Sequence, residues 1–473
     1  MKKSFYQWHR VLGLTALVPV IFWTLSGLSH PFMSNWFRPF IPREVFHPLT
    51  QDQMKPVLSL QQVMDQNHIL RLRNFSLVNF DRGTFYQIQQ SDSTYQYYSA
   101  INATILPDGD KRYAIYLARY FTNDTSSAIK SAQLQTTFDG RYQPINHLLP
   151  VWKISLDRPD GMDVYIETSQ SRMGTFNNNT RKAFLWLFDQ FHTWRFLAWM
   201  GGEKFRVIVL IVIVAVMLLS LISGLTVYGL FWKRFKEIKQ KREANGTVDK
   251  RFIHRFHRQI GLIVSLVMFT FVISGGFHLV VKLYNLKPEH RPYHQLITRQ
   301  ELGQSNLRLP VADSVIRRVA LVKFNNNVYY QVLDKKKQIQ YFRAADHQLL
   351  PNGDVVFATY LSQFYHDGPV NGRPAVSQVK QFDNEYGFIN KRLPVEKISY
   401  PDGENWYIET TTGKLATKVS GTDRAEGLSF IFLHKYFGMA WAGKNIRDIV
   451  SMLAALGVLV VSLFGFASFL KNK

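Results

Sequence analysis

The chain alternates between long apolar segments and longer stretches of ordinary soluble composition. Each apolar segment has about the 20 residues that a helix needs to cross a bilayer. The segments lie near residues 11–29, 205–232, 260–281 and 446–470. The pattern predicts an α-helical four-helix transmembrane bundle, embedded in a lipid bilayer and joined to large soluble parts.

The soluble stretches have the pattern of small α+β domains. Strand-like alternation occurs in "FSLVNF", "TFYQIQQ", "VYYQVLD" and "VYIET", and "LPDGD", "LPNGD", "RPDG" and "YPDG" are turn signals between such runs. Short helical patterns lie near 59–67, 111–121, 311–319 and 355–364. We therefore expect two small units of helix and antiparallel sheet in each half of the chain.

The two halves of the chain repeat each other. At one offset of 248 residues, His9, Gly13, Ser26, Gly27 and His30 recur as His257, Gly261, Ser274, Gly275 and His278. In the soluble stretches, "FDGRYQPINHLLPVWKIS" matches "FDNEYGFINKRLPVEKIS", and "PDGMDVYIETS" matches "PDGENWYIETT". The second helices match through His192, Trp199, Gly201 and Arg206, which answer His434, Trp441, Gly443 and Arg447. This pattern indicates an internal tandem duplication with a pseudo-two-fold axis along the membrane normal.

Charge sets the expected orientation. The loop 233–258 holds ten Lys or Arg against three acidic residues, so it should stay in the cytoplasm with both termini. The formal charge of +23 leaves a surplus that could attract anionic ligands to the outer domains. The expected boundaries are 1–32, 205–232, 259–282 and 446–473 for the helices (the last with a cytoplasmic tail), 33–204 and 283–445 for the periplasmic domains, and 233–258 for the loop.

The absence of cysteine limits the redox chemistry. Without thiols the chain can form no disulfide, no iron–sulfur cluster and no covalently attached c-type haem. Any redox centre must therefore be held by other ligands.

The repeated histidines are the candidate ligands. On a helix His9 and His30 lie on one face, about 60° apart in angle and about 31 Å apart along the axis. The small residues beside them leave room for a flat group, and haem b needs one axial imidazole from each of two helices. The candidate pairs are His9 with His257 on the cytoplasmic side and His30 with His278 on the outer side, with His192 and His434 as competing outer ligands. Anchoring at the membrane interface is the alternative role for each histidine.

Arginines recur near the outer boundary of the helices. They are Arg38, Arg206, Arg291 and Arg447. An Arg side chain can bind a haem propionate in a bidentate manner, and the alternative is that it reaches to the lipid headgroups.

"WHRVLGL" with "SGLSH", repeated as "FHRQIGL" with "SGGFH", together with "PDG…YIET" and "FHTW…W", resembles the PepSY-associated transmembrane helix proteins, also called iron-regulated membrane proteins. The resemblance covers nearly the whole chain. It implies a bacterial inner-membrane protein with PepSY-like periplasmic domains and b-type haem on the motif histidines, and the family includes siderophore reductases. Some relatives carry a fused flavodoxin or reductase domain that this sequence lacks, so the electron donor must be a separate molecule.

These observations predict a reductase with two haem b groups. It would pass electrons from a quinol or a cytoplasmic reductase to a periplasmic acceptor, a ferric siderophore or another ferric chelate, and would release Fe(II). We expect no nucleic-acid partner. The alternative is a non-redox module whose PepSY-like domains bind peptides or restrain a protease, and a permease is disfavoured because the helices have few polar residues at mid-membrane.

Overall fold

The computed structural model describes residues 2–244, 252–285, 292–303, 309–366 and 372–470. The chain forms two compact units. The helical unit contains Met1–Arg38, Thr180–Pro288 and Thr422–Lys473, and the sheet unit contains Pro39–Asn179 and Glu289–Gly421. Residues 180–204 and 422–445, which the sequence placed with the soluble domains, therefore group with the helices.

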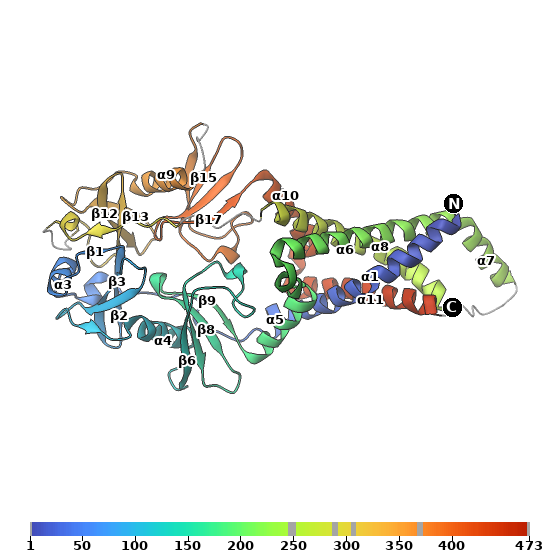
Figure 1. Ribbon diagram of the computed structural model, residues 1–473, viewed down its shortest axis with the longest axis horizontal. Helices are drawn as coiled ribbons and strands as arrows, with labels where there is room; N and C mark the ends of the chain where they lie inside the picture. Colours follow the sequence, from blue (N-terminus) through green and yellow to red (C-terminus); the bar gives the residue numbers. More distant parts are fainter. Residues whose placement is uncertain (1, 245–251, 286–291, 304–308, 367–371, 471–473) are drawn as a thin grey trace. The chain divides into compact units, whose positions relative to one another are not determined.

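Four long helices build the helical unit. They are α1 (Lys2–Pro31), α6 (Phe196–Leu230), α8 (Phe252–Tyr284) and α11 (Lys444–Leu470). Within the described part of the chain, these are the helices long and apolar enough to cross a membrane, which confirms the four predicted segments. Both α1 and α8 pack against α6 and α11, so the contacts close a ring in which α1 and α8 are diagonal to each other. Figure 1 shows the four helices running alongside one another.

Shorter elements complete the helical unit. They are the π-helix Phe32–Trp36, α5 (Asn179–Phe191), α7 (Trp232–Ala244), α10 (Gly421–Ser429), the π-helix Phe430–His434 and the 3₁₀ segment Phe437–Ala442. Helix α6 departs from helical geometry at Gly201 and Gly202, and the φ of +80° at Gly202 lies in the region that favours glycine. Trp194 and Tyr436 adopt left-handed backbone angles just after His192 and His434, so the backbone turns sharply after each of these histidines.

The first lobe of the sheet unit, residues 39–179, holds two four-stranded antiparallel sheets and the helix α4 (Gly109–Thr122). One sheet comprises β2 (Asn74–Phe80), β3 (Gly83–Gln89), β4 (Tyr95–Ser99) and β5 (Ile105–Leu106), and the other β6 (Ile129–Gln135), β7 (Val151–Leu156), β8 (Asp163–Glu167) and β9 (Arg172–Asn177). The short helices α2 (Gln51–Met54) and α3 (Leu60–Gln66) precede them. Leu117 and Phe121 of α4 share one buried core with Phe80 and Ile154, which come from the two sheets.

The described part of the second lobe, residues 289–421, follows a similar order of elements, but its first sheet has three strands instead of four. Its strands are β11 (Ile316–Phe324), β12 (Asn327–Asp334) and β13 (Ile339–Arg343), then β14 (Ala375–Val379), β15 (Val395–Ser399), β16 (Asn405–Glu409) and β17 (Lys414–Val419), with α9 (Gly353–Tyr365) between the two sets. The helix expected at 311–319 is wrong, because Ile316 already begins β11. The β-branched residues Ile316, Val319 and Val322 favour a strand there.

The two lobes are joined by backbone strand pairing and by one common hydrophobic core. Strand β1 (Arg71–Leu72) pairs with β10 (Ile297–Thr298) from the other lobe. Tyr86 of the first lobe and Tyr330 of the second lie in one buried core, and Gln61 Nε2 donates a hydrogen bond of 3.0 Å to the Tyr330 hydroxyl. One buried core is therefore common to both lobes, in addition to the core that each lobe has of its own.

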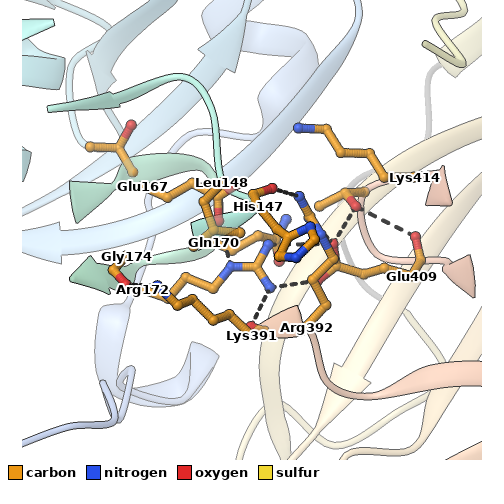
Figure 2. A network of polar contacts seen from close by, with 12 residues as sticks. His147, Leu148, Glu167, Gln170, Arg172, Gly174, Lys391, Arg392, Glu409 and Lys414 are labelled. Carbon is orange, nitrogen blue, oxygen red and sulfur yellow. Dashed lines mark hydrogen bonds and ion pairs between the residues drawn. The ribbon is translucent and has the colours of Figure 1, made fainter. Parts of the chain in front are cut away.

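A buried ionic network also joins the lobes (Figure 2). Arg172 donates to Glu167 of its own lobe and, through Nη1 at 2.7 Å, to Glu409 of the other lobe. Arg392 Nη1 donates to Glu409 at 2.6 Å, and its Nη2 donates to the carbonyl of His147 at 2.8 Å. Burial disfavours the charge on Glu409, but the two arginines outweigh it and hold the pKa of that carboxyl well below its usual range.

Breaking this network should loosen both lobes. Arg172→Met leaves two buried carboxylates short of a donor, and uncompensated buried charges of this kind cost about 3–5 kcal/mol. Hydrogen exchange of the β9 and β16 peptides in the full-length protein measures the loss of opening free energy. The exposed pair Arg112–Asp81, at 2.9 Å, gives the control Arg112→Met, which should cost no more than about 1 kcal/mol. Equal effects of the two substitutions would contradict the proposed role of the network.

Candidate functional site

His9 and His257 meet inside the ring of helices. They come from α1 and α8, and their ring centroids are 6.2 Å apart with the planes tilted by 35°. The Nδ1 of His9 lies 3.1 Å from the carbonyl of Ser220 on α6, and the Nδ1 of His257 lies 3.0 Å from the carbonyl of Val461 on α11. A carbonyl only accepts, so both Nδ1 atoms carry the proton and both Nε2 atoms keep a free lone pair.

Two glycines on the neighbouring helices make room for these rings. A Cβ built on Gly224 of α6 would lie 2.8 Å from the Cε1 of His9, and one on Gly465 of α11 would lie 3.0 Å from the Cε1 of His257. Both separations are shorter than normal contacts. Only glycine therefore allows each imidazole to keep its present position against the adjacent helix.

A cavity of about 370 Å³ surrounds this pair of histidines. Gly13 and Gly261, the small residues that recur in the sequence, line it together with apolar side chains of all four long helices. Arg10 and Arg258 also line it, and each directly follows one of the two histidines in the chain. The cavity thus combines the imidazoles of His9, His254 and His257 with an apolar wall and two cations, which suits a flat apolar group with carboxylate substituents.

A second pair forms at the other end of the helices. The ring centroids of His192 and His434 are 6.4 Å apart, with the planes at 87°. The Nδ1 atoms lie 3.1 Å from Ser26 Oγ and 3.2 Å from Ser274 Oγ, respectively. Each serine hydroxyl donates to a carbonyl of its own helix, at 2.6 and 2.7 Å, so it accepts from the imidazole. Both Nε2 atoms again keep a free lone pair.

His30 and His278 each contact a phenylalanine that also stacks on a histidine of the second pair. Phe188 stacks on His192 at 4.4 Å and also contacts His30, with ring centroids 5.8 Å apart. On the other side Phe430 stacks on His434 at 4.7 Å and contacts His278 at 5.2 Å. The Nδ1 of His278 also lies 2.7 Å from Glu426. Of the two outer pairings expected from the sequence, the structure brings together His192 with His434.

Both pairs have the spacing of two imidazoles on opposite sides of one metal ion. With each nitrogen about 2 Å from the metal, the ring centroids of such a pair are roughly 6 Å apart. A ligating histidine commonly donates its other ring N–H to a carbonyl or hydroxyl, as all four do here. Among the described residues no group of three or more His, Cys, Asp or Glu side chains lies close enough together to hold a metal ion.

The four predicted arginines occupy different surroundings. Arg206 donates to Glu203 at 2.9 Å and to the carbonyl of Thr193, which ties the start of α6 to the turn after His192. The guanidinium of Arg447 lies 3.9 Å from the ring centroid of Phe437. Arg38 is exposed in the helical unit, and Arg291 lies outside the described residues.

Several site residues were not identified from the sequence. Ser26 and Ser274 were noted only for their small size, yet their hydroxyls orient the second pair of histidines. Gly224 and Gly465 were missed, although they occupy matching positions in the two halves. Arg10 and Arg258 recur at the same offset as the histidines beside them, and that repeat was the available signal.

A substitution at Gly224 tests the packing around the first pair. Gly224→Val places a side chain where the ring of His9 lies, and overpacking of this kind costs about 1–3 kcal/mol. Thermal unfolding of the purified protein in detergent should show a lower midpoint. Gly229→Val on the same helix is the control, since no atom lies within 4 Å of its added Cβ. A normal midpoint for Gly224→Val would mean that His9 does not depend on this space.

Comparison with known proteins places the chain in a family. The family model described as the PepSY-associated TM region matches residues 122–472, about three quarters of the chain. The match includes α5, α6, α8 and α11 and therefore both partners of the second histidine pair. A search of curated proteins finds no match. The chain belongs to the family of membrane proteins that share the PepSY-associated TM region.

Proposed function

We propose that this protein is a membrane reductase that holds two haem b groups and passes electrons to a ferric chelate. The observation that supports the proposal is the paired arrangement of four imidazoles at the two ends of the helical unit. Their centroid distances are 6.2 and 6.4 Å, and every Nδ1 is committed to an oxygen of another helix. A haem bound between each pair would supply one-electron chemistry.

The protein's own residues would bind and orient the two groups. His9 and His257 would be the axial ligands of one haem, and His192 and His434 those of the other. Arg10 and Arg258 stand where carboxylate substituents of the first group could be paired. Trp23 Nε1 donates to the carbonyl of His192 at 2.8 Å and so fixes the backbone of the second pair.

This assignment shortens the distance between the two layers of ligands. Ser26, which holds His192, lies 17 residues after His9 on α1. That separation corresponds to roughly 25 Å of helical rise, against roughly 31 Å for His30. Beside the outer layer the ring of Trp194 contacts those of Phe22 and Trp23, with centroid distances of 6.2 and 5.9 Å.

The proposed acceptor is a ferric siderophore outside the inner membrane of a bacterium. Reduction to Fe(II) weakens binding by hard oxygen ligands and releases the metal. The sheet unit would face the periplasm, because the basic loop 233–258 favours the cytoplasm. The donor would be a quinol or a cytoplasmic reductase. An internal duplication would account for pairs in which each histidine meets its equivalent from the other half. A non-redox peptide-binding role gives no reason for such pairs.

Haem content of single variants tests the ligand assignment. His9→Ala and His257→Ala should each remove one haem per chain and leave the other spectrally intact, because loss of one axial imidazole leaves a weakly held group. His192→Ala and His434→Ala should remove the other haem. His30→Ala and His278→Ala are the matched controls and should retain both. Loss of a haem in the His30 or His278 variant, with both retained in the His192 and His434 variants, would reverse the outer assignment.

Reporter fusions test the orientation. A cytoplasm-active reporter inserted after residue 240 should be active, and a periplasm-active reporter inserted near residue 140 should be active as well. Charge bias across the short loop is the reason, since positively charged loops are retained inside. Activity of the periplasmic reporter at residue 240 would overturn the proposed location of the sheet unit.

A further inference from the structure

The first lobe contains a short buried chain of hydrogen bonds that ends on a carboxylate. Gln87 Nε2 donates to the Tyr97 hydroxyl at 2.6 Å, and this hydroxyl donates to Asp110 Oδ1 at 2.9 Å. The indole Nε1 of Trp152 on β7 donates to the other oxygen, Asp110 Oδ2, at 2.6 Å. Both oxygens of this carboxylate therefore have a donor.

The second lobe repeats the chain but changes its last member. Gln331 Nε2 donates to the Tyr341 hydroxyl at 2.6 Å, which donates to Asp354 Oδ1 at 2.7 Å. In the aligned segments "VWKIS" and "VEKIS", Glu396 stands where the first lobe has Trp152. The register agrees, because Trp152 pairs with Ile166 and Glu396 pairs with Ile408. The second lobe therefore has a carboxyl group where the first has an indole N–H, which can only donate a hydrogen bond.

This replacement leaves buried oxygens without a donor. Asp354 Oδ2 and Glu396 Oε2 have no hydrogen-bond partner, and neither has the hydroxyl Oγ1 of Thr410 beside them. The exposed fractions are 8% for Asp354 and 2% for Glu396. Two adjacent carboxylates cannot both remain ionised at such burial, because like charges in a poorly solvated site repel strongly.

We propose that Asp354 and Glu396 hold one proton between them at neutral pH, and that Glu396 donates it to Asp354 in place of the indole N–H found in the first lobe. The pair then acts as a proton-binding site that connects α9 to β15. This inference concerns the sheet unit alone and does not depend on the proposed reductase activity.

The surroundings of the pair favour the protonated state. Tyr341 on β13, Gln378 on β14 and Thr410 after β16 face it as neutral groups, and Lys380 after β14 is the cation that acts on it. Lys397, the next residue on β15, lies over the ring of Tyr407 on the opposite face of the sheet. Burial, followed by the adjacent Asp354, raises the pKa of Glu396 to about 8.

The sign of the pH effect follows from that shift. The folded lobe binds a proton that the unfolded chain releases near its ordinary pKa of about 4.3. Stability from the pair is therefore complete at low pH and falls as the pH rises toward 8, with the opening constant increasing by at most about tenfold per pH unit.

Hydrogen exchange of the full-length protein at pH 6, 7 and 8, corrected for intrinsic exchange rates, tests the proposal. In the wild type, peptides from α9 and β15 should lose protection with rising pH, while those from α4 and β7 should not. Glu396→Gln supplies a permanent N–H donor and should abolish this difference between the lobes. A wild type whose lobes respond equally, or a variant that keeps the difference, would overturn the proposal.

Two further measurements complete the test. Infrared spectra of the wild type should show a protonated buried carboxyl at pH 6 that is lost by pH 9, which keeps the test valid if Glu396→Gln folds poorly. Hydrogen exchange measured again in the presence of Ca²⁺ or of EDTA shows whether a cation is bound to the pair. If Ca²⁺ restored protection at pH 8 and EDTA removed protection at pH 6, the pair would hold a metal ion and the shared proton would be excluded.

Discussion

The hydrogen bond from each imidazole Nδ1 to an oxygen on another helix is the constraint on which the helical unit depends. It fixes the tautomer of the ring and leaves its Nε2 lone pair free. The bonds of His9 and His257 tie α1 to α6 and α8 to α11, and those of His192 and His434 tie the turns after α5 and α10 to α1 and α8. The same contacts therefore contribute to helix packing and orient the four imidazoles.

The sheet unit shows how two lobes with a similar order of elements diverge in chemistry. In the matched "HLLP" and "KRLP" segments, Leu148 of the first lobe is answered by Arg392 of the second, and this arginine completes the ionic network around Glu409. Likewise Glu396 occupies the position of Trp152, so an indole N–H that donates to an aspartate is replaced by an ionisable carboxyl group. Each change adds an ionisable group to only one lobe, so the two lobes differ in their titratable groups although their elements follow a similar order.

Much of this architecture could be predicted from local patterns, and the exceptions have physical causes. The four membrane segments, α4, α9 and strands such as β3 and β12 followed from hydropathy and alternation. The strand at 316–324 was mistaken for a helix over its first residues because a short apolar run satisfies both periods. His192 and His434 were named only as competing candidates, because the left-handed residues Trp194 and Tyr436 beside them have no signature in sequence periodicity.

The absorption spectrum and haem content of the wild-type protein, purified from haem-replete cells, test the central claim most directly. The account predicts two non-covalent b-type haems per chain, both six-coordinate and low-spin with two imidazole ligands. A colourless protein, or one with five-coordinate haem only, would contradict it, because the four free Nε2 atoms would then have no metal to bind.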